Sequence, residues 1–254
     1  MKTAAIVLIG NELLSGKIRD KNGYYLMRRL RGLGVDLKRM AVVQDIREDI
    51  ARELESCSAS YDYVFTSGGV GPTHDDVTLE SIAGAFGVGL ERNATLEGVL
   101  RDHFQERITD AHLGMADLPV GMTLIEDDAI RWPVLVFGNV FVLPGIPQLF
   151  HAKFEAIADR FRDGQFFLRS IYLNEDEANI ADLLEKVEKD RGVTIGSYPR
   201  WFDTEYRLRL TVEARAVGQV DQACGDLMRG IDPAHVVRLD PSAVPSDSPD
   251  MVTP

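Results

Sequence analysis

The sequence predicts an α/β domain with a largely parallel sheet, followed by a small α+β module. In the first part of the chain, apolar runs of strand length alternate with stretches of helical spacing, an order typical of parallel strands joined by helices. The first run, residues 3–9 ("TAAIVLI"), is almost continuously apolar, as expected for a strand that helices cover on both faces. From about residue 167 the predicted order becomes βαββαβ, which is typical of a ferredoxin-like module.

The other elements of the first part have their own local signals. Residues 22–34 carry tyrosine and leucine at helical spacing and end in two glycines, which predicts a helix. Residues 133–145 predict a hairpin because a Gly-Asn pair joins two apolar runs. Pro147 suits the first position of the helix that follows. The remaining predicted elements are strands at 35–43 and 62–66 and helices at 47–61, 79–87, 95–108 and 148–161.

The second module is expected to have four strands and two helices. We divide the chain into a first domain at 1–164, the small module at 165–240, and a Pro/Ser/Asp-rich tail at 241–254 that is expected to be disordered. The strands of the module are predicted at 167–173, 193–198, 205–216 and 235–239, and its helices at 179–192 and 219–231.

Composition limits the classes of function. The chain of 254 residues has a formal net charge of −12, which disfavours general binding to nucleic acid or to an anionic membrane. Backbone amides, a metal ion and a few cations can still create a site for a small anion.

No apolar run approaches the ~20 residues that span a bilayer. Cys57 and Cys224 lie far apart, which argues against a zinc site or a disulfide scaffold and fits the cytoplasm. The first apolar run ends without a cleavage pattern, so it is expected to be a strand and not a signal peptide.

Four loops follow predicted strands and are expected to converge. In open α/β sheets, ligands bind beyond the carboxyl ends of the strands. The loops are "GNELLSGKIRDKN" (10–22), "QDIRED" (44–49), "SGGVGPTHDD" (67–76) and "LPGIPQ" (143–148). The first nearly imitates a P-loop, but five residues rather than four separate its glycines, and Ile18 replaces the hydroxyl that Mg²⁺ needs. The glycines of the third loop do not have the spacing of a Rossmann fingerprint.

The third loop suggests a phosphate site with acids beside it. A strand that leads into a glycine turn and then a helix can hold a phosphate on backbone amides. Asp75 and Asp76 suit a divalent metal, a general base or helix capping. Two alternatives stay open. In one, the third loop is a plain glycine turn and Asp76 caps the helix that follows it. In the other, Asp45 caps the helix that follows the second loop. His74 is either a phosphate donor or an exposed turn residue.

Two further groups have open interpretations. Lys17, Arg19 and Lys21 form a short basic patch, either a solvated turn or a source of positive charge near a diphosphate. Trp132, Trp201, and Tyr198 beside Arg200 are either core aromatics or rings that stack on a base or flavin.

The third loop also carries a resemblance. "TSGGVGPTHDDVT" (66–78) resembles the signature of the molybdopterin-binding domain family with the MoaB/Mog-like fold, in which Gly-Gly-x-Gly precedes Asp-x-Thr. It is most similar to the N-terminal domain of CinA proteins and also resembles the related domain of eukaryotic FAD synthases. "IGNELLSGKIRDKN", "VVQDIREDI", "VFVLPGIPQLF" and "GSYP" agree with CinA-like chains in order. The resemblance covers about residues 3–240 and implies a three-layer fold with a mostly parallel sheet.

Site residues follow from this resemblance position by position. Asp76 and Asp45 fall on the two acids that the family associates with ligand handling and catalysis, and Asp75 is a third catalytic candidate. Asp75 and Asp76 are the expected metal ligands. The expected phosphate- and nucleotide-binding residues are Gly68, Gly69, Gly71, Pro72, Thr73, His74, Thr78, Glu12, Lys17, Asp20, Asn22, Pro144 and Gly145.

The resemblance implies a hydrolase that acts on phosphorus anhydrides. The expected reaction is hydrolysis of ADP-ribose or FAD-type dinucleotides to AMP and a second monophosphate, with Mg²⁺, Mn²⁺, Co²⁺ or Ni²⁺ and with K⁺ as a candidate monovalent ion. The alternatives are molybdopterin binding or adenylylation, and a scaffold without activity. We expect a small-molecule nucleotide or pterin phosphate as partner, no nucleic acid or membrane, and a dimer or trimer of the chain. The nicotinamide-nucleotide deamidase domain of CinA proteins does not fit in this chain, so that activity is not transferred.

Overall fold

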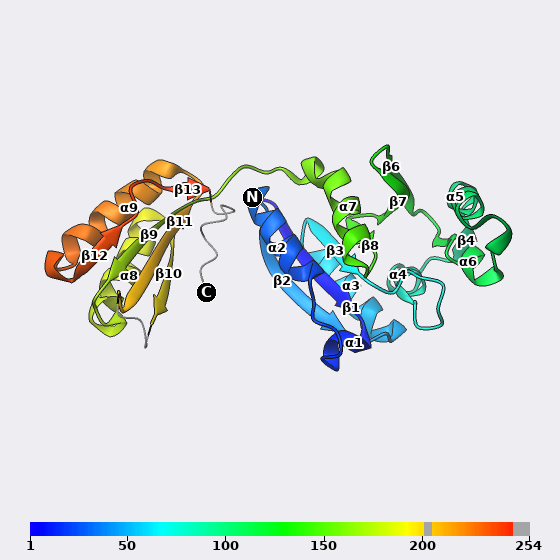
Figure 1. The fold of residues 1–254 in the computed structure, drawn as a ribbon, viewed down its shortest axis with the longest axis horizontal. Helices are drawn as coiled ribbons and strands as arrows, with labels where there is room; N and C mark the ends of the chain where they lie inside the picture. The colour runs from blue at the N-terminus through cyan, green and yellow to red at the C-terminus, as the bar shows by residue number, and fades with distance from the viewer. Residues whose placement is uncertain (201–204, 246–254) are drawn as a thin grey trace. The chain divides into compact units, whose positions relative to one another are not determined.

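The structure is a computed structural model that describes residues 1–200 and 205–245. The chain divides into two compact units, Met1–Asp163 and Gly164–Pro254, and Figure 1 shows the elements of each. Each unit has its own sheet and its own hydrophobic core.

The first unit is built on a six-stranded sheet with the order β2-β1-β3-β8-β7-β6. The pairs β2–β1, β1–β3 and β3–β8 are parallel, whereas β8–β7 and β7–β6 are antiparallel. The mostly parallel sheet is therefore confirmed, and the predicted hairpin is the β7–β8 pair. The strands are β1 (Thr3–Ile9), β2 (Asp36–Val43), β3 (Tyr63–Ser67), β6 (Thr123–Asp127), β7 (Ile130–Phe137) and β8 (Val140–Leu143).

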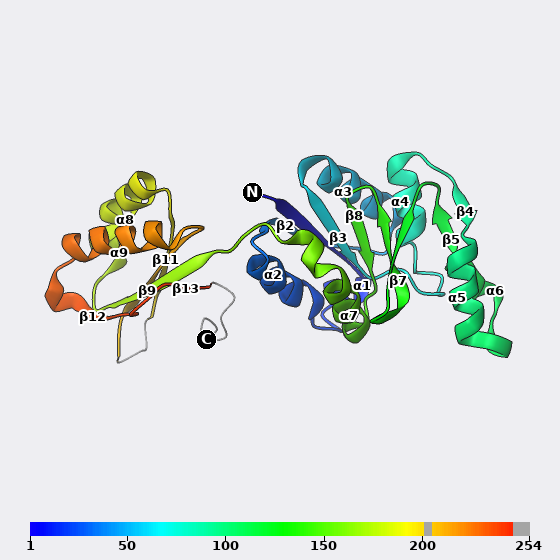
Figure 2. The same cartoon turned by 90° about the horizontal axis from the view of Figure 1, so that it is seen from above.

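Helices cover both faces of this sheet. In Figure 2, α2 (Asn22–Gly32) and α7 (Pro147–Ile157) lie on one side of the strands, and α3 (Arg47–Ser60) and α4 (Thr78–Phe86) lie on the other. The side chains of β1 alternate between two core clusters. Ala5, Val7 and Ile9 pack with the helices α3 and α4, and the residues between them pack with α2 and α7. This alternation explains why the run is apolar throughout and confirms the three-layer fold.

An excursion after α4 was only partly predicted. It contains short strands, one long helix and two short helical turns. The sequence predicted only the long helix. The expected helix at 95–108 stops at Phe104, because Gln105 has a φ of +47°. Strands of three residues are too short to show a periodicity. The elements are β4 (Leu90–Arg92), α5 (Ala94–Phe104), α6 (Asp110–Gly114) and β5 (Asp117–Pro119), with a 3-10 turn at Gln105–Arg107. The short helix α1 (Asn11–Leu14) was also not predicted.

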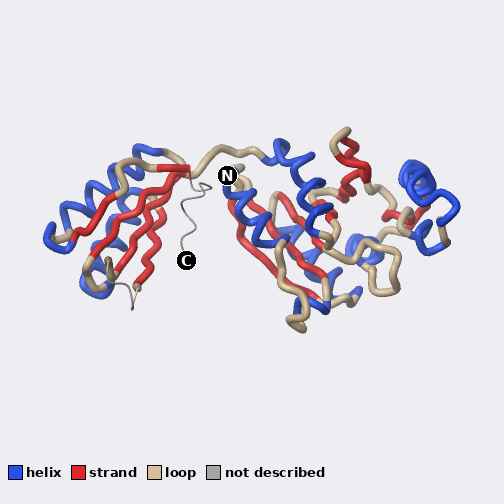
Figure 3. The backbone as a smooth tube through the Cα atoms, in the orientation of Figure 1, coloured by secondary structure: helices blue, strands red, loops and turns tan. Residues whose placement is uncertain are grey.

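The second unit has the predicted βαββαβ order. Its antiparallel strands lie in the order β10-β11-β9-β12, which is the ferredoxin-like arrangement, and Figure 3 shows these strands in red with helices beside them. Val244–Pro245 (β13) pairs with β9, so the ordered chain extends beyond residue 240, where the tail was expected to begin. The rest of that expected disordered tail, 246–254, lies outside the described residues. The elements are β9 (Phe167–Leu173), α8 (Glu177–Arg191), β10 (Thr194–Pro199), β11 (Leu208–Ala214), α9 (Val217–Gly230) and β12 (Val236–Leu239).

The two cysteines are free and buried. Burial raises the pKa of the Cys57 thiol to about 12 and that of Cys224 to about 11, so neither is a reactive thiolate at neutral pH. None of the helices in the described residues combines the length and the apolar character needed to cross a membrane.

Asn139 joins the β7–β8 turn to the end of α3, which gives a test of the fold. Its Nδ2 donates to the carbonyl oxygens of Ser58 and Tyr61 at 3.0 and 2.8 Å, and its Oδ1 accepts from the Ser58 hydroxyl at 2.6 Å. We expect Asn139→Ala to lower the free energy of unfolding by about 1–3 kcal/mol, because half-buried groups lose their partners.

The measurement is urea unfolding read from Trp132 fluorescence in a Trp201→Phe background, since these are the two tryptophans of the chain. Asp128→Ala, in the exposed β6–β7 turn, is the control and should change little. An unchanged midpoint for Asn139→Ala would show that these bonds do not stabilise the unit.

Candidate functional site

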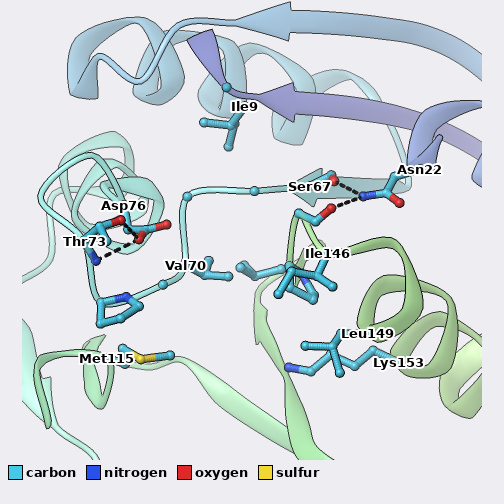
Figure 4. A pocket seen from close by; sticks show the side chains of 18 of the residues that line it. Ile9, Asn22, Ser67, Val70, Thr73, Asp76, Met115, Ile146, Leu149 and Lys153 are labelled. Atoms are coloured by element: carbon cyan, nitrogen blue, oxygen red, sulfur yellow. Dashed lines mark hydrogen bonds between the residues drawn. The ribbon is translucent and has the colours of Figure 1, made fainter. Parts of the chain in front are cut away.

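One cavity of about 900 Å³ lies in the first unit, where the loops after β1, β2, β3 and β8 meet. Figure 4 shows it from close by, with Val70 near its centre and Thr73 and Asp76 on one side. The structure thus brings the four predicted loops together, at the carboxyl ends of parallel strands. The volume lies near the upper end of the range of about 300–1,000 Å³ that is usual for ligand pockets.

The first two glycines of the third loop are required by the protein's own chain. Gly68 has a φ of +107°, and a Cβ atom there would lie 2.4 Å from the carbonyl oxygen of Ile9. Gly69 has a φ of +66°, and its Cβ would lie 2.3 Å from Oγ1 of Thr78. The Thr78 hydroxyl donates to the Gly68 carbonyl at 3.0 Å. Contacts with Ile9 and Thr78 therefore fix the conformation of the turn, and three of its backbone amides are available to a ligand.

Those amides belong to Gly69, Val70 and Gly71. Within the described part of the chain they make no hydrogen bond, and all three residues line the cavity. Successive free amides beside the start of a helix form a favourable environment for an anion.

Asp76 shapes the loop and does not cap a helix. Its Oδ2 accepts from both the backbone amide and the hydroxyl of Thr73, as Figure 4 shows. The N-cap of α4 is Val77, without a side-chain bond, so the helix-cap alternative for Asp76 is wrong. A Cβ at Gly71 would lie 2.6 Å from the Asp76 carboxylate, which explains the third glycine.

Asp75 is exposed beside this turn. The nearby Thr73 side chain, its own backbone amide and the charge of His74 hold the pKa of Asp75 below its ordinary value. It is therefore ionised at neutral pH. Among the described residues, no group of three or more His, Cys, Asp or Glu could hold a metal ion by itself. Mg²⁺ in proteins is often held by one or two carboxylates together with substrate phosphates, and Asp75 and Asp76 supply two carboxylates to the lining of the cavity.

The acids of the first two loops also bind backbone amides. Asp45 accepts from the amide of Asn11 at 2.8 Å and so ties the second loop to the first. The N-cap of α3 is Ile46, so the interpretation of Asp45 as a cap of that helix is wrong. Asp20 accepts from the amides of Asn22 and Gly23 at the start of α2.

Asn22 links three loops from a buried position. Its Nδ2 donates to Oγ of Ser67 and to the carbonyl of Gly145, both at 2.9 Å, and Figure 4 shows both bonds. Asn22 is 4% exposed, and its Oδ1 has no hydrogen-bond partner among the residues that the structure describes. Because a buried acceptor without a partner costs free energy, a ligand hydroxyl or a water is expected to fill this place.

Most of the predicted site residues line the cavity, but three do not. Lys17 and His74 are exposed outside it, and Thr78 is buried beneath the glycine turn as a structural residue. The predicted residues in the lining are Glu12, Asp20, Asn22, Asp45, Gly68, Gly69, Gly71, Pro72, Thr73, Asp75, Asp76, Pro144 and Gly145. Arg19, Lys21 and Trp132 also line it, whereas Trp201 lies outside the described residues.

Lys153 was not predicted. It lies on α7, and Figure 4 shows its side chain pointing into the cavity beside Leu149. Its Nζ donates to the carbonyl of Pro133 at 2.7 Å, and burial lowers the pKa of the amine to about 8. The sequence contains one signal for this burial: Lys153 lies on the same apolar face of the predicted helix as Phe150 and Phe154, which are both fully buried.

An apolar wall was also missed, apart from Trp132. Side chains from α5, α6 and β7 form it, and the excursion that carries two of these elements was poorly predicted. We call this wall the aromatic compartment. It consists of Leu96, Leu100, His103, Phe104, Met115 and Trp132.

This fold and cavity define an α/β protein with a cavity of ligand size at the carboxyl edge of its sheet. Residues 5–163 match the family model described as "Probable molybdopterin binding domain". The match spans more than half of the chain, so the chain belongs to this family and has its MoaB/Mog-like fold. Residues 165–240 match the model of "FAD synthase, middle domain".

Named relatives agree with this family. A protein of Caenorhabditis briggsae named "Probable FAD synthase" is 34% identical over 95% of this chain and 52% of its own length. A "CinA-like protein" of Myxococcus xanthus is 32% identical over 86% of this chain and 56% of that protein. The chain therefore spans about half the length of these curated relatives. The crystal structure of "the protein CinA with unknown function from Thermoplasma acidophilum" has 30% identity and a TM-score of 0.59, and the match covers 63% of this chain and 98% of that one.

The glycine turn gives a prediction about stability. We expect Gly68→Ala to destabilise the first unit by at least about 1–3 kcal/mol, because alanine is strained at positive φ and its Cβ meets a backbone oxygen. Gly84→Ala is the matched control. Gly84 lies within α4 with open space around its Cβ position, so that change should stabilise by about 0.5–1 kcal/mol. Urea unfolding measures the stability of both variants. Equal effects of the two substitutions would show that the contact with the Ile9 carbonyl does not require glycine at position 68.

Lys153 gives a prediction about pH. In the unfolded chain its amine titrates near its ordinary value of 10.5, and in the folded protein near 8. Between pH 8 and pH 10.5 the unfolded state binds more protons than the folded state at this amine. The contribution of Lys153 to the free energy of unfolding therefore rises with pH. We expect Lys153→Met to remove that rise, which is on the order of 2–3 kcal/mol, so that the variant and the natural protein converge in stability above pH 8.

Unfolding in urea from pH 7 to 10.5 measures this difference. Lys17→Met is the control because Lys17 is exposed and its removal should leave the pH dependence unchanged. Parallel curves for the natural protein and Lys153→Met would contradict the lowered pKa.

Proposed function

We propose that the protein is a metal-dependent nucleotide pyrophosphatase that cleaves dinucleotide diphosphates of the FAD or ADP-ribose type to AMP and a second monophosphate. The observation that carries this proposal is the composition of one cavity, whose lining includes free amides and acids of the loop after β3 together with apolar and aromatic side chains of α5 and β7. A dinucleotide likewise combines a charged diphosphate with flat rings.

The names of the relatives support a dinucleotide. Proteins named as FAD synthases match along nearly the whole chain, and the second unit matches the middle domain of that enzyme family. FAD contains two phosphates between an adenosine and a flavin, so its diphosphate is suited to the amides of Gly69, Val70 and Gly71.

The charges of the lining explain why a metal would be needed. Five acids and three lysine or arginine residues line the cavity, so a diphosphate meets net negative charge. Asp75 and Asp76, together with ligand phosphates, would hold a divalent ion. The chemistry that such an ion supplies is charge neutralisation and acidification of a water molecule. In the hydrolysis, the oxygen of water bonds to one phosphorus and the bond from that phosphorus to the bridging oxygen breaks.

The chain's own residues would position the ligand. The free amides bind phosphate oxygens, the unpartnered Oδ1 of Asn22 accepts from a ribose hydroxyl, and Lys153 adds positive charge inside the cavity. Because phosphoryl transfer needs little covalent chemistry from the protein, such positioning and charge supply most of the rate.

A second candidate function is molybdopterin binding or adenylylation, which the family match at 5–163 favours. The same amides would hold the pterin phosphate. It predicts nucleotide-dependent adenylylation of the pterin and no cleavage of FAD or ADP-ribose.

AMP release from FAD and ADP-ribose tests the first proposal, with Mg²⁺, Mn²⁺, Co²⁺ or Ni²⁺ and with or without K⁺. We expect release that EDTA abolishes. Asp76→Asn should keep the two bonds from Thr73, since the amide oxygen still accepts, but it removes the charge. Its kcat should fall by about 100-fold or more, with a much smaller change in ligand affinity.

Thr73→Ala is the matched variant, because it removes the hydroxyl bond and keeps the Asp76 charge. If Asp76→Asn retained full turnover, the acid would serve only to shape the loop. If the natural protein released no AMP with any of these ions, the pyrophosphatase proposal would be wrong, and pterin binding would be measured next.

A further inference from the structure

The aromatic compartment is larger than phosphate binding requires. Its members come from α5, from Met115 directly after α6, and from the start of β7. Leu96 and Leu100 are buried, and the other members are partly buried. None of the six side chains carries a fixed charge, so this wall cannot serve the diphosphate and must face another part of the ligand.

The rings of the compartment are held in place by one another. His103 meets Trp132 edge to face, with centroids 5.0 Å apart and planes at 68°. Phe104 lies 6.2 Å from Trp132 and is stacked on His112 at 3.8 Å. A wall of mutually packed rings is preorganised, which lowers the entropy cost of binding a flat ligand.

The compartment offers few polar atoms. Its side chains provide only the two ring nitrogens of His103 and the indole nitrogen of Trp132. Nδ1 of His103 is buried and has no hydrogen-bond partner in the described part of the chain. A ligand ring that suits this wall therefore has a mostly apolar edge and a polar atom that can meet His103.

Three kinds of ring can be compared with this wall. Adenine and pterin carry nitrogen or oxygen atoms around most of their edges, and these would lose water without gaining partners. An isoalloxazine has an apolar dimethylbenzene edge. The central-ring nitrogen beside that edge can meet His103, and the ring's other hydrogen-bonding groups lie at the far end. The burial of unsatisfied polar atoms costs about 1–3 kcal/mol each, so the flavin ring fits best.

We propose that the aromatic compartment binds the isoalloxazine ring of a flavin nucleotide and makes the cavity specific for flavin over adenine. This rests on the proposed function in placing the phosphate on the glycine turn. Trp132 provides the stacking surface, and Leu96 and Leu100 face the dimethylbenzene edge. The protein then discriminates FAD from ADP-ribose, although both contain an adenosine diphosphate.

Binding of two monophosphates tests this without any hydrolysis. FMN and AMP each carry one phosphate and differ in the ring. In a Trp201→Phe background, where Trp132 is the remaining tryptophan, FMN should quench the protein's fluorescence and bind at least about tenfold more tightly than AMP. Equal affinities for FMN and AMP, or FMN binding that leaves the emission of Trp132 unchanged, would overturn the proposal.

Trp132→Leu separates ring binding from phosphate binding. By equilibrium dialysis, it should weaken FMN about tenfold and leave AMP within twofold, and the retained AMP affinity shows that the variant is folded. Arg131→Ala is the matched control, because Arg131 is the exposed neighbour that does not line the cavity. An equal loss for both nucleotides would overturn the proposal.

Kinetics distinguish this inference from the proposed function. Trp132→Leu should raise KM for FAD about tenfold and leave KM for ADP-ribose within twofold. If the natural protein cleaves neither substrate, the hydrolase proposal fails while the FMN result still decides the compartment. If it cleaves both and Trp132→Leu raises both KM values equally, the hydrolase proposal holds and the flavin assignment fails.

Discussion

At Gly68 the backbone passes so close to the carbonyl oxygen of Ile9 that no side chain fits between them, and the site depends on this contact. It fixes the end of β3 against the end of β1. Thr78 then closes the turn from below through the Gly68 carbonyl. The amides that follow are left without partners because the chain is already held by these contacts. The free amides, at which we propose that an anion binds, are thus a by-product of how two parallel strands end side by side.

The acids of the cavity have a similar double character. Asp20, Asp45 and Asp76 each accept hydrogen bonds from backbone amides of the loops that they shape. Such bonds to a carboxylate are stronger than bonds between neutral groups, so they order loops that have little other packing. The same charges repel a phosphate. A cation shared with the ligand removes this conflict, which is why loop geometry and metal dependence belong together in the proposed reaction.

Periodicity predicted the long elements well, because their apolar residues recur at 2 or 3.6 positions and helices or strands bury them. It failed for β4 and β5, whose three residues each carry no period. The loops that meet could also be predicted, since parallel strands end at one edge of a sheet. The structural roles of the residues in these loops could not be predicted. Gly68 and Gly69 suggested that a phosphate lies close to the backbone, whereas the structure shows that atoms of Ile9 and Thr78 lie close to these two glycines. Lys153 was hidden because the residues that bury it come from distant parts of the chain.

Lys153 lies close to the aromatic compartment along the chain's contacts. Its amine donates to the carbonyl of Pro133, the residue after Trp132, and burial lowers the pKa of this amine to about 8. In such surroundings an attraction between opposite charges is stronger than in water. In the proposed function, an anionic ligand would stabilise the charged amine and raise the pKa of Lys153 toward its ordinary value. A flavin ring that fills the compartment, as we propose, would displace water near this amine and strengthen the attraction, so that ring recognition and phosphate binding would reinforce each other.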